Sequence, residues 1–111
     1  MLTDGEIEIL EQAKTANPWY FQALIQAAGV MPVRRQKYSG DGDPFTNFHI
    51  AGRIMGHSPL ETFRWYQALK LARLQMDSGD FADERTADTL RDLANYVLLE
   101  AGFRIQQQES A

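Results

Sequence analysis

The chain has 111 residues, a net charge of −4 at pH 7 and no cysteine, which suits one domain with a modest core and excludes disulfides, thiolate zinc sites and cysteine nucleophiles. The acidic balance argues against broad nucleic-acid binding, which usually needs a basic face. No apolar run approaches the roughly 20 residues of a membrane span, and the acidic N-terminus is unlike a signal peptide, so we expect no membrane contact and a cytoplasmic location.

Two helices are predicted in the first part of the chain. A capping-box pattern followed by apolar residues at helical spacing predicts a helix over residues 4–15. An Asn-Pro pair then suits the start of a second helix, and Gly29 suits its end. We therefore expect residues 1–30 to form an N-terminal helical pair.

The helical periodicity disappears over residues 31–44, where turn-forming Pro and Gly residues predict one long irregular loop. Long ordered loops are often functional. A core region over residues 45–103 follows, and the polar tail 104–111 is expected to fray. Three more helices are predicted, at about 44–56, 59–76 and 83–101. With no alternating strand pattern, the predicted fold is a single all-α domain, a small bundle of about five helices.

Three acidic residues share one face of the last predicted helix. Glu84, Asp88 and Asp92 follow one another at intervals of four residues. Two or three carboxylates can hold Mg²⁺, which prefers oxygen ligands and keeps waters or a substrate phosphate. Asp88 and Asp92 are therefore candidate magnesium ligands, with Glu84 as a further ligand, and they are the candidate catalytic residues if the chain is an enzyme. The alternative is a solvated acidic face near a helix N-terminus, where negative charge is favourable.

Lys70 and Arg73 lie three residues apart on the preceding helix. They are candidates to hold a phosphate, or to pair with Asp88 and Asp92 across the helix hairpin. Spacing does not separate these two interpretations, and both stay open.

The expected loop combines cations, an aromatic ring and glycines. Lys37 suits phosphate binding, Tyr38 suits stacking on a base, and Asn47 suits hydrogen bonding to a base. The other aromatic residues of the helices are expected to be core or subunit contacts: Trp19, Tyr20, Trp65 and Tyr66.

Several short runs, in this order, resemble a known family. They are Lys37-Tyr38-Ser-Gly40, Asn47-Phe48, Ser58-Pro59, Leu-Lys-Leu-Ala-Arg-Leu over 69–74, and Asp-Thr-Leu-Arg-Asp-Leu-Ala-Asn-Tyr over 88–96. The pattern, which covers about residues 35–102, resembles the nucleotide-modification-associated type 1 domain of phage and bacterial proteins. It is more distantly similar to the all-alpha, MazG-like nucleotide pyrophosphohydrolases.

The resemblance implies an all-α bundle that forms a homodimer or higher homo-oligomer, acting in the cytoplasm on a nucleotide or nucleoside phosphate. MazG-like enzymes use Mg²⁺ to cleave nucleoside triphosphates to monophosphate and pyrophosphate. Asp92 matches the aspartate of their Glu-x-x-Asp motif, and Tyr96 joins the expected ligand-binding residues. Thr89, however, stands where that motif carries glutamate, and Lys70 stands where a metal-binding carboxylate is expected.

Two functions follow as hypotheses. In the first, the chain is an enzyme that processes a nucleotide, with Mg²⁺ on Asp88 and Asp92. In the second, it is a non-catalytic nucleotide-binding or oligomeric interaction module, and the Lys/Arg–Asp contacts are a structural salt-bridge network. Carboxylates on only one helix of the hairpin favour binding, whereas the resemblance favours hydrolysis.

Overall fold

The computed structural model describes residues 1–38, 40, 42–76 and 83–110. This part of the chain holds five α-helices and no strand, which confirms the predicted all-α fold. The helices are α1 (Asp4–Ala16), α2 (Pro18–Tyr38), α3 (Thr46–Met55), α4 (Pro59–Gln75) and α5 (Glu84–Ser110). None of the described helices has the length and apolar composition needed to cross a bilayer.

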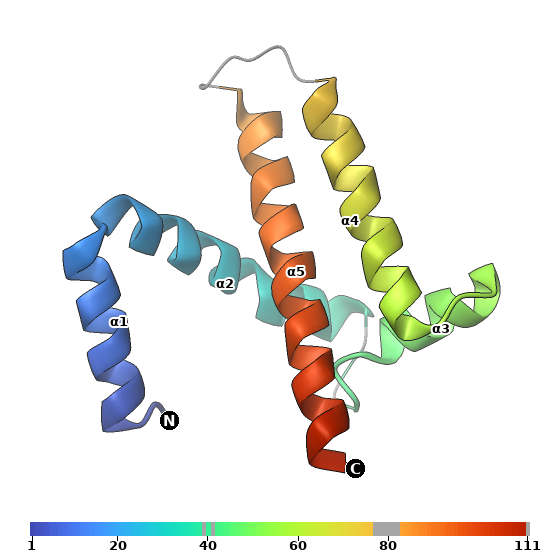
Figure 1. Ribbon diagram of the computed structural model, residues 1–111, viewed down its shortest axis with the longest axis horizontal. Coiled ribbons are helices and arrows are strands. Elements are labelled where there is room, and N and C mark those ends of the chain that lie inside the picture. The colour runs from blue at the N-terminus through green and yellow to red at the C-terminus, as the bar shows by residue number, and fades with distance from the viewer. Residues whose placement is uncertain (39, 41, 77–82, 111) are drawn as a thin grey trace.

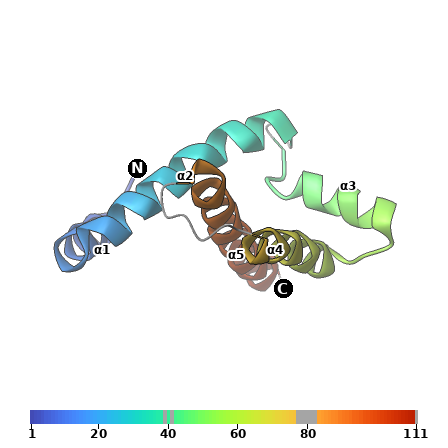
Figure 2. The same ribbon diagram turned by 90° about the horizontal axis from the view of Figure 1, so that it is seen from above.

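The helices pack around an antiparallel hairpin of α4 and α5 (Figure 1). The long helix α2 crosses α5, and the short helix α3 packs on α4. Helix α1 turns back along the first half of α2, so α1 and this half of α2 project away from the hairpin (Figures 1 and 2). The end of the molecule opposite α1 is therefore built from α3, the hairpin and the C-terminal half of α2.

The core is a cluster of phenylalanine rings between α3, α4 and α5. Phe45 precedes α3, Phe48 lies on it, Phe63 lies on α4 and Phe103 on α5. Phe45 meets Phe63 and Phe103 edge-on, at ring-centroid distances of 6.1 and 5.4 Å. Edge-to-face pairs of this kind add stability beyond the burial of apolar area. Tyrosines and leucines surround the cluster: Leu60, Tyr66, Tyr96 and Leu99.

Helix α2 extends further than the sequence predicts. It continues through Gly29 and Pro32 to Tyr38, so the predicted helix end at Gly29 and the loop start at residue 31 are wrong. The described glycines with positive φ are Gly40 and Gly56, so Gly29 has ordinary helical backbone. Proline in a helix interior removes a backbone donor and opposes helix formation. Beyond the proline, Arg34 pairs with Asp92 of α5, a tertiary contact that favours the helical continuation against this local preference.

Helix α5 also continues past its predicted end near residue 101, reaching Ser110. The polar tail is therefore helical in its described part, contrary to the prediction that it frays. Gln106 Nε2 donates to Asp43 Oδ1 at 3.4 Å, and Ser110 Oγ donates to the carbonyl oxygen of Gln106 at 3.0 Å. These contacts give the last turns of α5 partners that the sequence alone does not reveal.

Two glycines provide a matched test of this fold. A Cβ at Gly52 would lie 2.7 Å from the carbonyl oxygen of His57 and 2.9 Å from Thr62 Oγ1, whereas a Cβ at Gly29 meets nothing within 4 Å. We expect Gly52→Ala to lower the free energy of unfolding by about 1–3 kcal/mol through overpacking. Gly29→Ala is expected to raise it by about 0.5–1 kcal/mol, because alanine favours a helix interior.

Urea unfolding of both variants measures these changes. A loss of stability in Gly29→Ala would contradict the continuous helix, because it would be the result expected for a glycine that ends a helix in the left-handed conformation.

Candidate functional site

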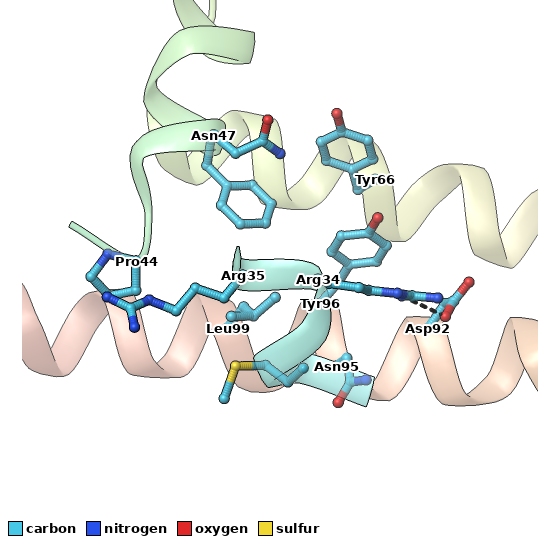
Figure 3. Close-up of a pocket in the computed structure, with 11 residues that line it drawn as sticks. Arg34, Arg35, Pro44, Asn47, Tyr66, Asp92, Asn95, Tyr96 and Leu99 are labelled. Carbon is cyan, nitrogen blue, oxygen red and sulfur yellow. Dashed lines mark ion pairs between the residues drawn. The ribbon is translucent and has the colours of Figure 1, made fainter. Parts of the chain in front are cut away.

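A pocket of about 470 Å³ opens where α2, α3, α4 and α5 meet (Figure 3). Its size is within the range of small-molecule sites. Its lining combines cationic, amide, aromatic and aliphatic side chains: Met31, Arg34, Arg35, Pro44, Asn47, Phe48, Tyr66, Asp92, Asn95, Tyr96 and Leu99.

Two tyrosine rings form the aromatic wall of the pocket. Tyr66 of α4 and Tyr96 of α5 stack with centroids 5.0 Å apart and planes 9° from parallel. Phe48 of α3 meets both rings edge-on, at 6.1 and 6.3 Å. The wall is therefore continuous with the phenylalanine core, which holds the rings in place.

Two neighbouring arginines from the last turns of α2 form the cationic wall. Arg34 Nη1 lies 2.8 Å from Asp92 Oδ1 of α5. Arg35 Nη2 donates to the carbonyl oxygen of Gly42 at 2.8 Å, which ties α2 to the segment before α3. Both side chains reach the pocket because α2 continues past Pro32.

Asp92 lies at the centre of an ion network. Its Oδ1 meets Arg34, and its Oδ2 lies 3.2 Å from Lys70 Nζ of α4. The side chains of Asp92 and Lys70 are only 14% and 12% exposed. Burial alone would raise the pKa of Asp92, but hydrogen bonds and charges from Arg34 and Lys70 outweigh burial and hold that pKa below its usual value.

Asn95 positions α2 against α5. It is buried, and its Nδ2 donates to the carbonyl oxygen of Ala27 at 3.0 Å. Ala27, Met31 and Arg34 are four and three residues apart, so they share one face of α2. That face packs on α5 and forms part of the pocket lining.

The pocket gathers three of the predicted site residues, namely Asn47, Asp92 and Tyr96. Lys70 reaches the same network through Asp92, as the salt-bridge interpretation of the sequence expects. Lys37 and Tyr38 fall in the last turn of α2, but their side chains lie outside the described part of the structure.

The remaining predicted residues lie elsewhere. Arg73 and Asp88 line a second hollow of about 600 Å³ on the α4–α5 hairpin, toward the ends that residues 77–82 join, and Asp92 lines this hollow as well as the pocket. Asp88 is 61% exposed and pairs with Arg91 at 3.2 Å. Glu84 is exposed in the first turn of α5.

The three acids of α5 do not gather into a metal-binding triad. In the described ranges, no group of three or more His, Cys, Asp or Glu side chains is placed to hold a metal ion. Asp92 faces Arg34 and Lys70 instead, and Asp88 pairs with Arg91, whose Nε also lies 4.0 Å from Asp92 Oδ1. A magnesium ion held by Asp88 and Asp92 with water ligands stays a prediction.

Sequence reasoning placed Arg34 in the expected loop, among cations suited to phosphate, and expected Tyr66 to be a core or subunit contact; the structure places both on helices that line the pocket. The available signal for Arg34 was the spacing of Ala27, Met31 and Arg34 on one helical face. The predicted helix end at Gly29 concealed that spacing.

No protein-family model, curated protein or solved structure matches this chain.

Two aspartates on α5 allow a matched test of the ion network. Asp92→Asn leaves Lys70 and Arg34 without their carboxylate. We expect the free energy of unfolding to fall by about 1–3 kcal/mol, a loss between those typical of exposed and of fully buried ion pairs. Asp88→Asn removes an exposed pair with Arg91 and is expected to cost less than about 0.5 kcal/mol. Urea unfolding at neutral pH compares them, and equal losses would contradict the central role of Asp92.

The same pair of proteins predicts a pH dependence. A carboxyl whose pKa is lowered by folding stabilises the folded state above its unfolded pKa, and this contribution disappears as pH falls through the folded pKa. The stability difference between wild type and Asp92→Asn is therefore expected to be complete at neutral pH, and to shrink as pH falls below the ordinary aspartate value of 3.8. Urea unfolding over a pH series measures it. A difference that grew toward low pH would have the wrong sign.

Proposed function

We propose that this chain binds a nucleotide or nucleoside phosphate in the pocket between α2, α3, α4 and α5, in the cytoplasm of a bacterial or phage-infected cell. The observation that carries the proposal is one pocket in which the Arg34–Asp92 pair lies beside the stacked Tyr66 and Tyr96 rings (Figure 3). Lys70 of α4 contacts the other oxygen of Asp92.

The charge of the pocket supports an anionic ligand. The whole chain carries a net charge of −4, yet the pocket lining includes two arginines and one aspartate. Lys70 shares the carboxylate of Asp92 with Arg34, so one negative charge faces two positive ones. Planar guanidinium groups suit phosphate because they donate two parallel hydrogen bonds.

The remaining lining supports an aromatic, hydrogen-bonding group on the same ligand. Tyrosine rings offer faces on which a base can stack, worth about 1–3 kcal/mol per base in nucleic-acid complexes. Asn47 adds an amide group of the type that pairs with base edges. A nucleotide combines an anion with a flat polar ring, and this lining offers groups for both.

Binding without metal is favoured over magnesium-dependent hydrolysis because the carboxylates already face cations. The two oxygens of Asp92 lie 2.8 Å from Arg34 and 3.2 Å from Lys70. A divalent ion at Asp92 would have to compete with both. The proposed role is therefore capture or sensing of a nucleotide, with Arg34 contacting the phosphate directly.

A thermal-shift screen of nucleoside mono-, di- and triphosphates tests the proposal, run once with Mg²⁺ and once with EDTA. A ligand that binds only the folded protein raises the unfolding midpoint by mass action. We expect at least one nucleotide to do so equally in both conditions. Arg34→Gln is expected to weaken its binding about tenfold or more in calorimetry, because a hydrogen bond to a charged group contributes about 1.5–3 kcal/mol.

Arg53→Gln, at an exposed position on α3, is the matched control and is expected to leave binding unchanged. Asp92→Asn distinguishes metal-free phosphate binding from magnesium-dependent binding. For each protein, the unfolding midpoint with nucleotide is compared with the midpoint of the same protein without ligand. Retained binding supports direct phosphate contact, whereas a requirement for Mg²⁺ together with loss of binding in Asp92→Asn would support the magnesium site instead. The absence of any nucleotide-induced shift would overturn the proposal.

A further inference from the structure

Helix α5 carries a second apolar face that none of the described helices covers. We name this face the outer stripe, and it consists of Leu90, Ala94, Val97, Leu98, Ala101 and Ile105. All six residues are exposed, and the four larger side chains are 49% to 56% accessible. At 3.6 residues per turn, the six positions fall within an arc of about 100°, which is the width of a helix face that packs on a neighbour.

The outer stripe points away from the rest of the molecule. Tyr96 and Phe103 face α4, while Asn95 faces α2. On a helical wheel these residues lie on the sides of α5 away from the stripe. In Figure 1, α4 runs along one side of α5, whereas on the opposite side α2 only crosses α5 and α1 stands apart from it.

The surface area of the chain is large enough to supply an interface. A folded monomer of 12.6 kDa is expected to expose about 6,200 Å², whereas this chain exposes 8326 Å². The excess of about 2,100 Å² exceeds the roughly 800 Å² per partner of a standard interface. The radius of gyration of 15.8 Å is likewise above the roughly 13 Å of a compact domain of this length. The projecting α1–α2 pair accounts for part of both excesses.

The large and small residues of the outer stripe are placed symmetrically about its centre, so the stripe presents the same order of residue sizes in both directions along α5. About the midpoint between Val97 and Leu98, Leu90 is as far on one side as Ile105 is on the other. Ala94 and Ala101 are likewise equidistant from it. An antiparallel pairing of two copies about a two-fold axis therefore sets large residues against large ones and alanine against alanine. A two-fold interface requires this self-complementarity, because the same patch serves both subunits.

We infer that this protein forms a homodimer in which α5 of one copy packs antiparallel on α5 of the other along the outer stripe. The occupant of the exposed face is thus a second copy of this chain. The inference does not depend on nucleotide binding, since the outer stripe lies apart from the pocket-lining residues of α5.

The mass in solution tests this dimer, with sedimentation equilibrium as the measurement. We expect the wild type to have twice the mass of one chain. Val97→Glu places a charge near the two-fold axis and is expected to give a monomer with unchanged helix content by circular dichroism. Leu71→Glu is the control, because Leu71 lies on α4 outside the outer stripe and is 52% exposed. It is expected to remain dimeric.

A monomeric wild type, or a dimer that survives Val97→Glu, would overturn the inference. A dimer disrupted by Leu71→Glu alone would place the interface elsewhere and would overturn it as well.

Disulfide trapping tests the antiparallel register, because the natural chain has no cysteine to interfere. Ala94→Cys and Ala101→Cys are each made as single variants and oxidised alone or as an equimolar mixture. The antiparallel pairing predicts that the mixture cross-links more than either variant alone. A parallel pairing would cross-link each variant with itself, and that result would contradict the proposed arrangement.

Discussion

The carboxylate of Asp92 is the contact that unites the helices around the pocket. It meets Arg34 of α2 and Lys70 of α4, so one side chain of α5 connects three helices that are distant in the sequence. Because Asp92 and Lys70 are largely shielded from water, either charge would be costly to leave unpaired. The pairing also determines where the last turns of α2 lie, since the sequence there does not favour a helix. The arginine wall of the pocket thus depends on a carboxylate more than fifty residues away along the chain.

The helices that begin with strong local signals were predictable, because the atoms that stabilise their first turns belong to neighbouring residues. Capping boxes form at Thr3 and Ser58, each between residues only three positions apart in the sequence. The second half of α2 was not predictable in this way. Gly29 and Pro32 are local arguments for an end to the helix, and the contact that opposes them, from Arg34 to Asp92, is visible only when α2 and α5 are placed side by side.

The sequence predicted the types of residue in the candidate site, but only some of the individual residues that form it. Asp92 and Lys70 were expected to pair across the hairpin or to bind phosphate, and they do pair. Asp88 was grouped with Asp92 because four-residue spacing suggests a shared face, yet Asp88 turns to Arg91. Spacing places side chains on a face but does not determine which helix packs there. For the same reason the role of Tyr66 could not be deduced before its stacking partner Tyr96 was located.

The isolation of α1 has a consequence for the dynamics of the chain. None of the 13 residues of α1, all within the described part of the structure, is buried, and the helix packs chiefly on the first half of α2. Cooperative units with few buried contacts open at a lower free energy than the core. The amide hydrogens of α1 should consequently exchange with solvent through local opening, whereas those around Phe63 should exchange only when the whole phenylalanine cluster unfolds. The molecule thus combines a firmly packed half, which contains the pocket, with a helical arm, α1, that opens largely independently of that half.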